Sequence, residues 1–295
     1  MRNQATLFSR HCTCITTMPD IYADKLTRSA AEGRRLNGQF DLLTRNIGYL
    51  IHPRIAAALP PSPRIADIGT GTGHFLQCVQ ESGAFPNATL DGYDISSSMY
   101  PQPLPKDINL KVLDMKQPVP EELHGVYDLV HARVLVAAIL PTEWTALVRN
   151  LTKLLKPGGW LQWGEGNFIS ATFLRGGALE SSPTDTLIAL GNKWKTEMRE
   201  RFECGWSTLP EDMRAAGLDS VDSDCVSSDR LPETRKEAVE NGMTAIFSWL
   251  RALASKGVGM TNEELDVAEK RANEEIEAGG YVRYDVYVVT GKKVL

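Results

Sequence analysis

RIADIGTGTG, the sequence of residues 64–73, is typical of a buried β-strand that runs directly into a glycine loop. Gly69, Gly71 and Gly73 have no Cβ atom, so they can adopt positive φ and let backbone N–H groups approach a ligand. The third glycine comes one residue earlier than in the dinucleotide-binding pattern G-x-G-x-x-G. With Asp67 at the end of the strand, the loop predicts a binding site for a nucleotide-like cofactor that carries an amino-acid tail. The glycines alone would also fit a tight strand-to-helix turn.

Two further predicted strands each end on a carboxylate. Residues 88–96 place Asp94 at about the distance from the glycines where a βαβ unit has its ribose-binding acid. Residues 109–115 end on Asp114, which can accept a hydrogen bond from the exocyclic amine of an adenine, while Met115 packs against the ring. We therefore expect three successive strand ends to gather around one adenosine-bearing ligand.

A fourth and a fifth strand are predicted at residues 127–133 and 159–165, the fifth after the helix stop LLKPGG. In motif order, spacing and residue identity, residues 64–165 resemble the class I S-adenosylmethionine-dependent methyltransferases. The sequence is similar to that of a fungal subgroup that modifies natural products, and this resemblance covers most of residues 20–295. The motifs on which this resemblance depends are EGRRLNGQF at 32–40, ADIGTGTG at 66–73, DGYDIS at 91–96 and LQW at 161–163.

The resemblance implies an α/β fold, a Rossmann-like seven-stranded sheet with helices on both faces and an antiparallel last strand. It implies S-adenosyl-L-methionine as cofactor and S-adenosyl-L-homocysteine as product. Arg35 and Gln39 would face the methionine end of the cofactor, where a guanidinium suits a carboxylate, or would only solvate the outer face of their helix. The cofactor-binding residues expected are Asp67, Gly69, Thr70, Gly71, Gly73, Asp94, Ile95, Asp114, Met115, His131, Arg35 and Gln39.

Three segments are expected along the chain. They are a disordered tail at 1–20, an N-terminal helical cap at 21–60, and a Rossmann-like methyltransferase domain at 61–295. Helical insertions at about 167–215 and 230–280 would sit at the carboxyl edge of the sheet and form a substrate lid. Residues 281–290 alternate in their first half and are apolar in their second half, which fits one last strand inserted antiparallel in the sheet.

Methyl transfer from a sulfonium depends mainly on positioning, and a base helps only where the acceptor holds its proton firmly. His131 ends the fourth strand and Glu165 ends the fifth, so we expect both to point toward the transfer site. His131 is the candidate base or acceptor-orienting group, and Glu165 is a second candidate for orienting the acceptor. Alternatively, His131 only packs beside the cofactor and Glu165 has a capping or structural role.

Composition limits the partners. With 295 residues and 42% hydrophobic side chains, the chain can bury a substantial core. A net charge of −5 without a basic stripe argues against nucleic acid, and no apolar run approaches the roughly 20 residues that cross a membrane. Five scattered cysteines predict reduced thiols and a cytoplasmic location. His11, Cys12 and Cys14 could bind a metal, but we expect no metal site, and residues 1–17 are either a tail or a targeting segment.

The sequence thus predicts a methyltransferase that modifies an oxygen or nitrogen of a small-molecule natural-product intermediate. The alternative is a methyltransferase-like protein that binds the cofactor but acts as a regulator, or as a non-methylating pathway enzyme such as a pericyclase. The acceptor atom, the acceptor scaffold and a homodimer all stay open.

Overall fold

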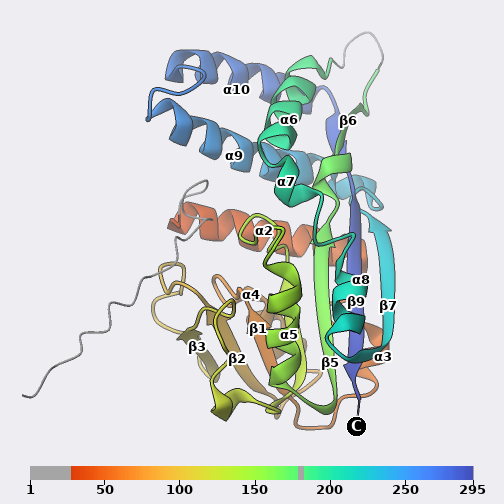
Figure 1. Ribbon diagram of the computed structural model, residues 1–295. Helices are drawn as coiled ribbons and strands as arrows, with labels where there is room; N and C mark the ends of the chain where they lie inside the picture. The colour runs from red at the N-terminus through yellow and green to blue at the C-terminus, as the bar shows by residue number, and fades with distance from the viewer. Residues whose placement is uncertain (1–27, 179–182, 295) are drawn as a thin grey trace, which may run out of the picture.

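A computed structural model describes residues 28–178 and 183–294, and its centre is one seven-stranded sheet (Figure 1). The strand order is β3-β2-β1-β4-β5-β9-β7, and β9 runs antiparallel to both of its neighbours. The predicted Rossmann-like sheet with an antiparallel last strand is confirmed. The strands are β1 Arg64–Ile68, β2 Thr89–Asp94, β3 Ile108–Val112, β4 Tyr127–Arg133, β5 Leu155–Gly166, β7 Leu218–Ser227 and β9 Asp285–Lys293.

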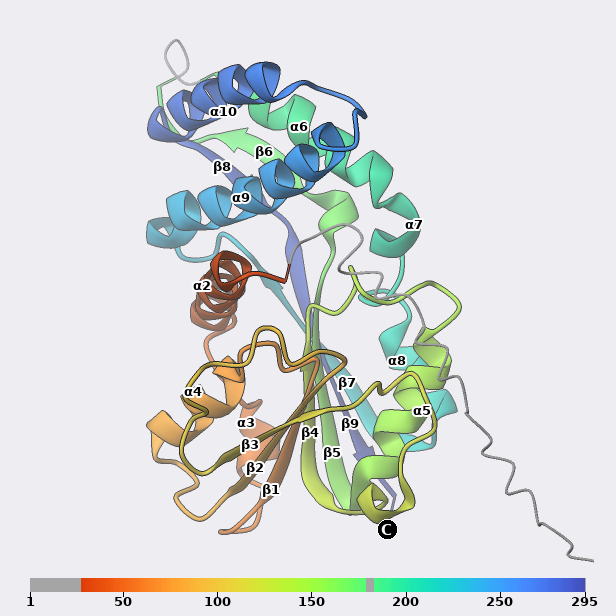
Figure 2. The same cartoon turned by 90° about the vertical axis from the view of Figure 1, so that its left-hand side faces the viewer.

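Helices cover both faces of this sheet (Figure 2). On one face, α3 and α4 pack over a core that contains Ile65 and Leu129, and on the other, α5 and α8 pack over Ala66 and Val130. Adjacent residues of β1 and β4 therefore face opposite cores, as the period-two geometry of a strand requires. The helices are α2 Ala30–Ile47, α3 Pro53–Ala56, α4 His74–Ser82, α5 Trp144–Leu154, α6 Asp185–Glu197, α7 Arg199–Phe202, α8 Leu209–Ala215, α9 Arg235–Ala254 and α10 Asn262–Glu277, with 3-10 turns η1 Glu121–Leu123, η2 Phe168–Ser170 and η3 Pro232–Thr234.

Most of the segments predicted as a lid form a separate layer above the carboxyl edge of the sheet, whereas α8, at the end of the first segment, packs on the sheet itself. In the separate layer, α6, α9 and α10 enclose a third hydrophobic core, and α2 lies between this layer and the sheet (Figures 1 and 2). Helix α10 begins with a capping box, in which Thr261 and Glu264 bond each other's backbone N–H. The domain boundaries themselves stay a prediction, and the expected tail at 1–20 lies outside the described residues.

The prediction of one continuous last strand at 281–290 is wrong. Its first half is β8 (Gly280–Arg283), which pairs with β6 (Thr172–Arg175) in a second small sheet within the lid. The chain leaves that sheet at Tyr284, whose N–H donates to Ser228 Oγ at 3.0 Å rather than to a neighbouring strand. The alternating half thus packs Val282 into the lid core, while the apolar half enters the main sheet.

Within the helical cap expected at 21–60, of which residues 21–27 lie outside the described part of the chain, the long helix is α2. It starts after Ser29, whose side chain accepts a hydrogen bond from Glu32 N–H, and it ends at Gly48 in the left-handed conformation. Among the described residues, no helix combines the length and the apolar character that crossing a membrane requires.

Candidate functional site

The glycine loop between β1 and α4 has the backbone that its sequence predicts. Gly69, Gly71 and Gly73 have φ values of 67°, 55° and 76°, a region that favours glycine. The N–H groups of Gly69 and Thr70 donate to the carbonyl of Tyr93, so the loop is bonded to β2. A Cβ atom on Gly69 would lie 2.4 Å from Leu135 Cδ2, so space as well as conformation requires glycine there.

A cavity lies over this loop and collects most of the predicted cofactor residues. It reaches from the ends of β1 and β2 to the segment after β3, and α2 closes it on the far side. Gly73, His131 and Arg35 are not among its lining residues. Those of the predicted set that do line it are Asp67, Gly69, Thr70, Gly71, Asp94, Ile95, Asp114, Met115 and Gln39.

Asp94 is fixed at the edge of this cavity by its neighbours. One carboxylate oxygen accepts from Gly71 N–H at 2.9 Å, and the other accepts from Ser96 N–H at 3.1 Å and from the Arg28 guanidinium at 3.2 Å. Asp94 is therefore both a wall of the cavity and a support of the glycine loop. Its role as a ribose ligand stays a prediction.

A cation that the sequence analysis did not assign also lines the cofactor cavity. Arg133, at the end of β4, donates to Thr44 Oγ1 at 2.7 Å and lies over the ring of Phe40 at 4.2 Å. Its Nε atom is buried and has no hydrogen-bond partner among the described residues. Burial lowers the pKa of the guanidinium to about 10, which leaves it charged at neutral pH. The available signal was its place at the end of the predicted strand 127–133, two residues after His131.

His131 lies beneath the glycine loop. Its ring stacks on Phe75 with centroids 3.7 Å apart, and Nδ1 is 2.7 Å from one oxygen of Asp67. The other oxygen of Asp67 accepts from the hydroxyl of Thr70, so His131 supports the loop through Asp67. Burial lowers the pKa of this imidazole, and only 1% of the residue is exposed.

Glu165 points to the opposite face of the sheet from His131. In the β4–β5 pairing, His131 is opposite Gln162, and Glu165 comes three residues later, which reverses the side-chain direction. The expectation that both side chains point toward one transfer site is therefore wrong.

The Glu165 carboxyl supports the chain that follows β4. One of its oxygens accepts from Leu135 N–H at 2.8 Å and from Trp163 Nε1 at 2.9 Å. Burial raises the pKa of this fully buried carboxyl to about 7. Glu165 thus holds the segment that contributes Val134 and Leu135 to the cofactor cavity.

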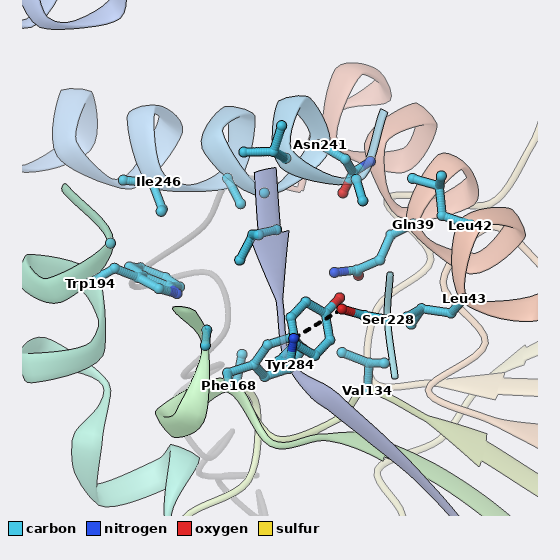
Figure 3. A pocket seen from close by; sticks show the side chains of 18 of the residues that line it. Gln39, Leu42, Leu43, Val134, Phe168, Trp194, Ser228, Asn241, Ile246 and Tyr284 are labelled. Carbon is cyan, nitrogen blue, oxygen red and sulfur yellow. Dashed lines mark hydrogen bonds between the residues drawn. The ribbon is translucent and has the colours of Figure 1, made fainter. Parts of the chain in front are cut away.

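A second cavity lies between α2 and the lid layer, where α6 and α9 line it (Figure 3). Aromatic and aliphatic side chains make most of its wall, including Phe168, Trp194 and Ile246. It meets the first cavity at α2 and at the end of β4. Four residues line both cavities, namely Leu36, Gln39, Leu43 and Val134.

The two cations of the second cavity are already bonded. Arg35 holds both oxygens of Glu32, at 2.8 and 2.7 Å, and donates to Asn241 at 3.1 Å. Lys195 donates to the carbonyl of Ala171. Among the described lining residues there is no Asp, Glu, His or Cys. Arg35 thus lies in the second cavity rather than the first, because Glu32, one turn earlier in α2, draws its guanidinium there.

Tyr284 supplies the polar group of this cavity that the sequence analysis missed. Its hydroxyl makes no hydrogen bond with any described residue, and burial raises its pKa to about 12, so it keeps its proton. In Figure 3 the hydroxyl lies on the same side of the cavity as the amide of Gln39. The only available signal was the junction between the alternating and apolar halves of residues 281–290.

Comparisons with known proteins agree with this architecture. A family model described as a methyltransferase domain matches residues 43–163. The methyltransferase grgD of a Penicillium species is 41% identical over 45% of this chain and 49% of its own length, so the chain spans about half of that relative. The N-methyltransferase gliN of Aspergillus fumigatus is 28% identical over 86% of this chain and 91% of its own length.

Among solved structures, a Haemonchus contortus phosphoethanolamine N-methyltransferase 2 in complex with S-adenosyl-L-methionine has a TM-score of 0.53. It is 13% identical, with 95% of this chain and 61% of that chain covered, which shows a shared fold. The seven-stranded sheet and the glycine loop agree with the methyltransferase-domain match over residues 43–163. In sequence the chain is similar to fungal methyltransferases such as these two.

Proposed function

We propose that this chain binds S-adenosyl-L-methionine in the glycine-loop cavity and methylates a nitrogen or oxygen of a small molecule held in the second cavity. One observation carries the proposal: the two cavities meet, and Leu36, Gln39, Leu43 and Val134 line both. A donor and an acceptor held on the two sides of this shared boundary would lie close to each other, as transfer of a methyl group requires.

The residues of the first cavity suit the parts of this cofactor. Asp94 has carboxylate oxygens that suit a ribose diol, and Asp114 and Met115 suit the edge and face of an adenine. For the carboxylate of the amino-acid tail we propose Arg133, because it is a cation of this cavity with a buried Nε–H that has no hydrogen-bond partner in the described part of the chain. Arg35 is left out of this role, since it is bonded to Glu32 beside the other cavity.

The chain's own contribution to catalysis is then positional. When bound, the cofactor supplies an activated methyl group on its positively charged sulfur. Tyr284 keeps its proton at neutral pH, so it donates a hydrogen bond that orients the acceptor. His131 acts through Asp67 on the glycine loop, rather than as a base. This arrangement favours an acceptor atom that is nucleophilic without a side-chain base. The "N-methyltransferase" in the name of the gliN relative is consistent with nitrogen.

The proposal is tested by following the methyl group. The purified chain is incubated with methyl-labelled cofactor and with extracts of a strain that lacks it, and labelled products are identified by mass. We expect a small molecule that gains one methyl group. Cofactor binding without label transfer to any extract component would instead favour the second hypothesis, a cofactor-binding regulator or pericyclase. A cytoplasmic location and a homodimer stay predictions.

A further inference from the structure

Beside the cofactor cavity, three metal-ligating side chains of different chemistry converge at the contact between α2 and α4. Asp41 belongs to α2, whereas His74 and Cys78 are four residues apart in α4 and so share one face of that helix. His74 Nε2 lies 2.7 Å from Asp41 Oδ1 and 3.7 Å from Cys78 Sγ. One ligand atom from each residue lies within 4.8 Å of the others.

The geometry does not suit a nucleophilic triad. In a triad, the imidazole contacts the nucleophile with one ring nitrogen and the orienting carboxylate with the other. Here Asp41 and Cys78 both approach Nε2 of His74. Three donors that converge on one point are what a bound cation requires.

We propose that Asp41, His74 and Cys78 bind a zinc-type divalent cation, with water as the fourth ligand. Oxygen, imidazole nitrogen and thiolate sulfur are all donors that Zn²⁺ accepts in a tetrahedral site. The cation takes the place of the hydrogen bond between His74 and Asp41. The thiol binds as thiolate, so its proton goes to solvent as the metal–sulfur bond forms.

The electrostatic surroundings favour a cation at this point. The carboxylates of Asp41 and Glu81 lie near the Cys78 thiol, and the Arg133 guanidinium is the cation that acts on the same group. The same two carboxylates attract a divalent ion, which in turn stabilises the thiolate. Asp41 is exposed and His74 is partly exposed, so the site is open to solvent and to metal exchange.

A cation here would join the two helices that border the cofactor cavity. Helix α4 follows the glycine loop directly, and α2 contributes Leu36 and Gln39 to the junction of the two cavities. A metal bridge would hold α2 in place over the loop. The inference stands independently of methyl transfer, because its readouts are metal binding and thermal stability.

The test uses cobalt as a spectroscopic probe in the full chain. Cys12→Ser and Cys14→Ser are introduced first, because His11, Cys12 and Cys14 form another group of ligand types in the sequence. Titration with Co²⁺ under reducing conditions should give one equivalent of binding, with near-ultraviolet absorption from a thiolate–cobalt bond. Zn²⁺ should displace the cobalt and raise the Tm.

Matched variants test whether Cys78 and Asp41 bind the metal ion. Cys78→Ser should abolish the thiolate–cobalt absorption, and Cys225→Ser, which changes an exposed cysteine outside the site, should leave it unchanged. Asp41→Asn alters only an exposed side chain and should weaken Zn²⁺ binding by about tenfold or more. Absence of cobalt binding, or absorption that survives Cys78→Ser, would overturn the proposal. Equal Zn²⁺ affinity of Asp41→Asn and its parent would remove Asp41 from it.

Discussion

The two cavities differ in how the chain builds them. The cofactor cavity takes most of its polar wall from strand ends within one stretch, from Asp67 to Met115. The second cavity is assembled from α2, the end of β4, η2, α6, α9 and Tyr284, which are far apart in the sequence. A ligand common to a whole class of enzymes can be read from a local motif. A ligand particular to one enzyme depends on the packing of distant segments.

The largest expected effect comes from filling the second cavity, which should lower turnover without changing cofactor affinity. Gly242 lines it from α9, and a Cβ atom there would meet no heavy atom within 4 Å. Gly242→Phe should therefore place its ring in the acceptor space and lower turnover by about a hundredfold or more, with cofactor affinity unchanged. Steady-state kinetics and calorimetric titration measure the two quantities.

The matched control is Thr244→Phe, an exposed position of the same helix. It should have the parent's turnover, because its ring points to solvent. If Gly242→Phe retains full turnover, the second cavity does not hold the acceptor.

Substitution of Asp94, in the first cavity, should instead lower cofactor affinity. Asp94→Ala removes a carboxylate that can bond the ribose, and hydrogen bonds to a charged group contribute about 1.5–3 kcal/mol, so cofactor affinity should fall roughly 10- to 100-fold. Asp94→Asn keeps an oxygen that can accept from Gly71 N–H, and it should lose less. Calorimetric titration with the cofactor measures both variants, and unchanged binding in Asp94→Ala would remove the ribose assignment.

The sequence predicted the first cavity well because its information is local. Strand period, glycine spacing and the acids at strand ends place Gly69, Asp94 and Asp114 without knowledge of packing. It failed where a side chain's direction depends on register. His131 and Glu165 both lie near the carboxyl ends of their strands, yet a difference of three positions in the β4–β5 pairing sends their side chains to opposite faces.

The second cavity shows a different limit of sequence reasoning. Tyr284 faces it because β8 leaves the main sheet to pair with β6, a strand too short and too little patterned to predict. Likewise, nothing local indicates that Asn241 of α9 bonds Arg35 of α2, because this contact joins residues about two hundred positions apart.

A smaller loss of turnover should show whether the second cavity orients the acceptor as well as holding it. Tyr284→Phe keeps the ring and removes only the hydroxyl, so turnover should fall by about five- to tenfold, the equivalent of one neutral hydrogen bond of about 1 kcal/mol. The loss should appear equally at all pH values between 6 and 9 if the hydroxyl only donates, because its pKa is raised to about 12. Kinetics across that range provide the measurement.

Tyr281→Phe is the matched control, since Tyr281 is three residues away and lies under Arg235 outside the cavity. Equal effects of the two variants would argue against a specific role for the Tyr284 hydroxyl.

The last expected effect is on stability rather than on turnover, and it concerns the segment that borders both cavities. Val134 lines both of them with φ at 50°, an unfavourable value for a β-branched residue, and Glu165 holds the next N–H in place. The pKa of Glu165 is raised from 4.5 to about 7, so between these values the folded chain binds a proton that the unfolded chain has released. The contribution of this carboxyl to the free energy of unfolding is therefore present below pH 4.5 and declines as the pH rises to about 7.

Glu165→Gln cannot ionise but keeps an oxygen that can accept from Leu135 N–H. Its free energy of unfolding, relative to the parent, should increase between pH 4.5 and 7 by at most about 3.5 kcal/mol, since one pKa unit corresponds to about 1.4 kcal/mol. Urea unfolding at pH 5 and pH 8 measures this change, and Glu122→Gln, at an exposed position, is the control. A stability difference that is the same at both pH values would mean that Glu165 ionises normally, and this segment would then be held by a charged carboxylate throughout.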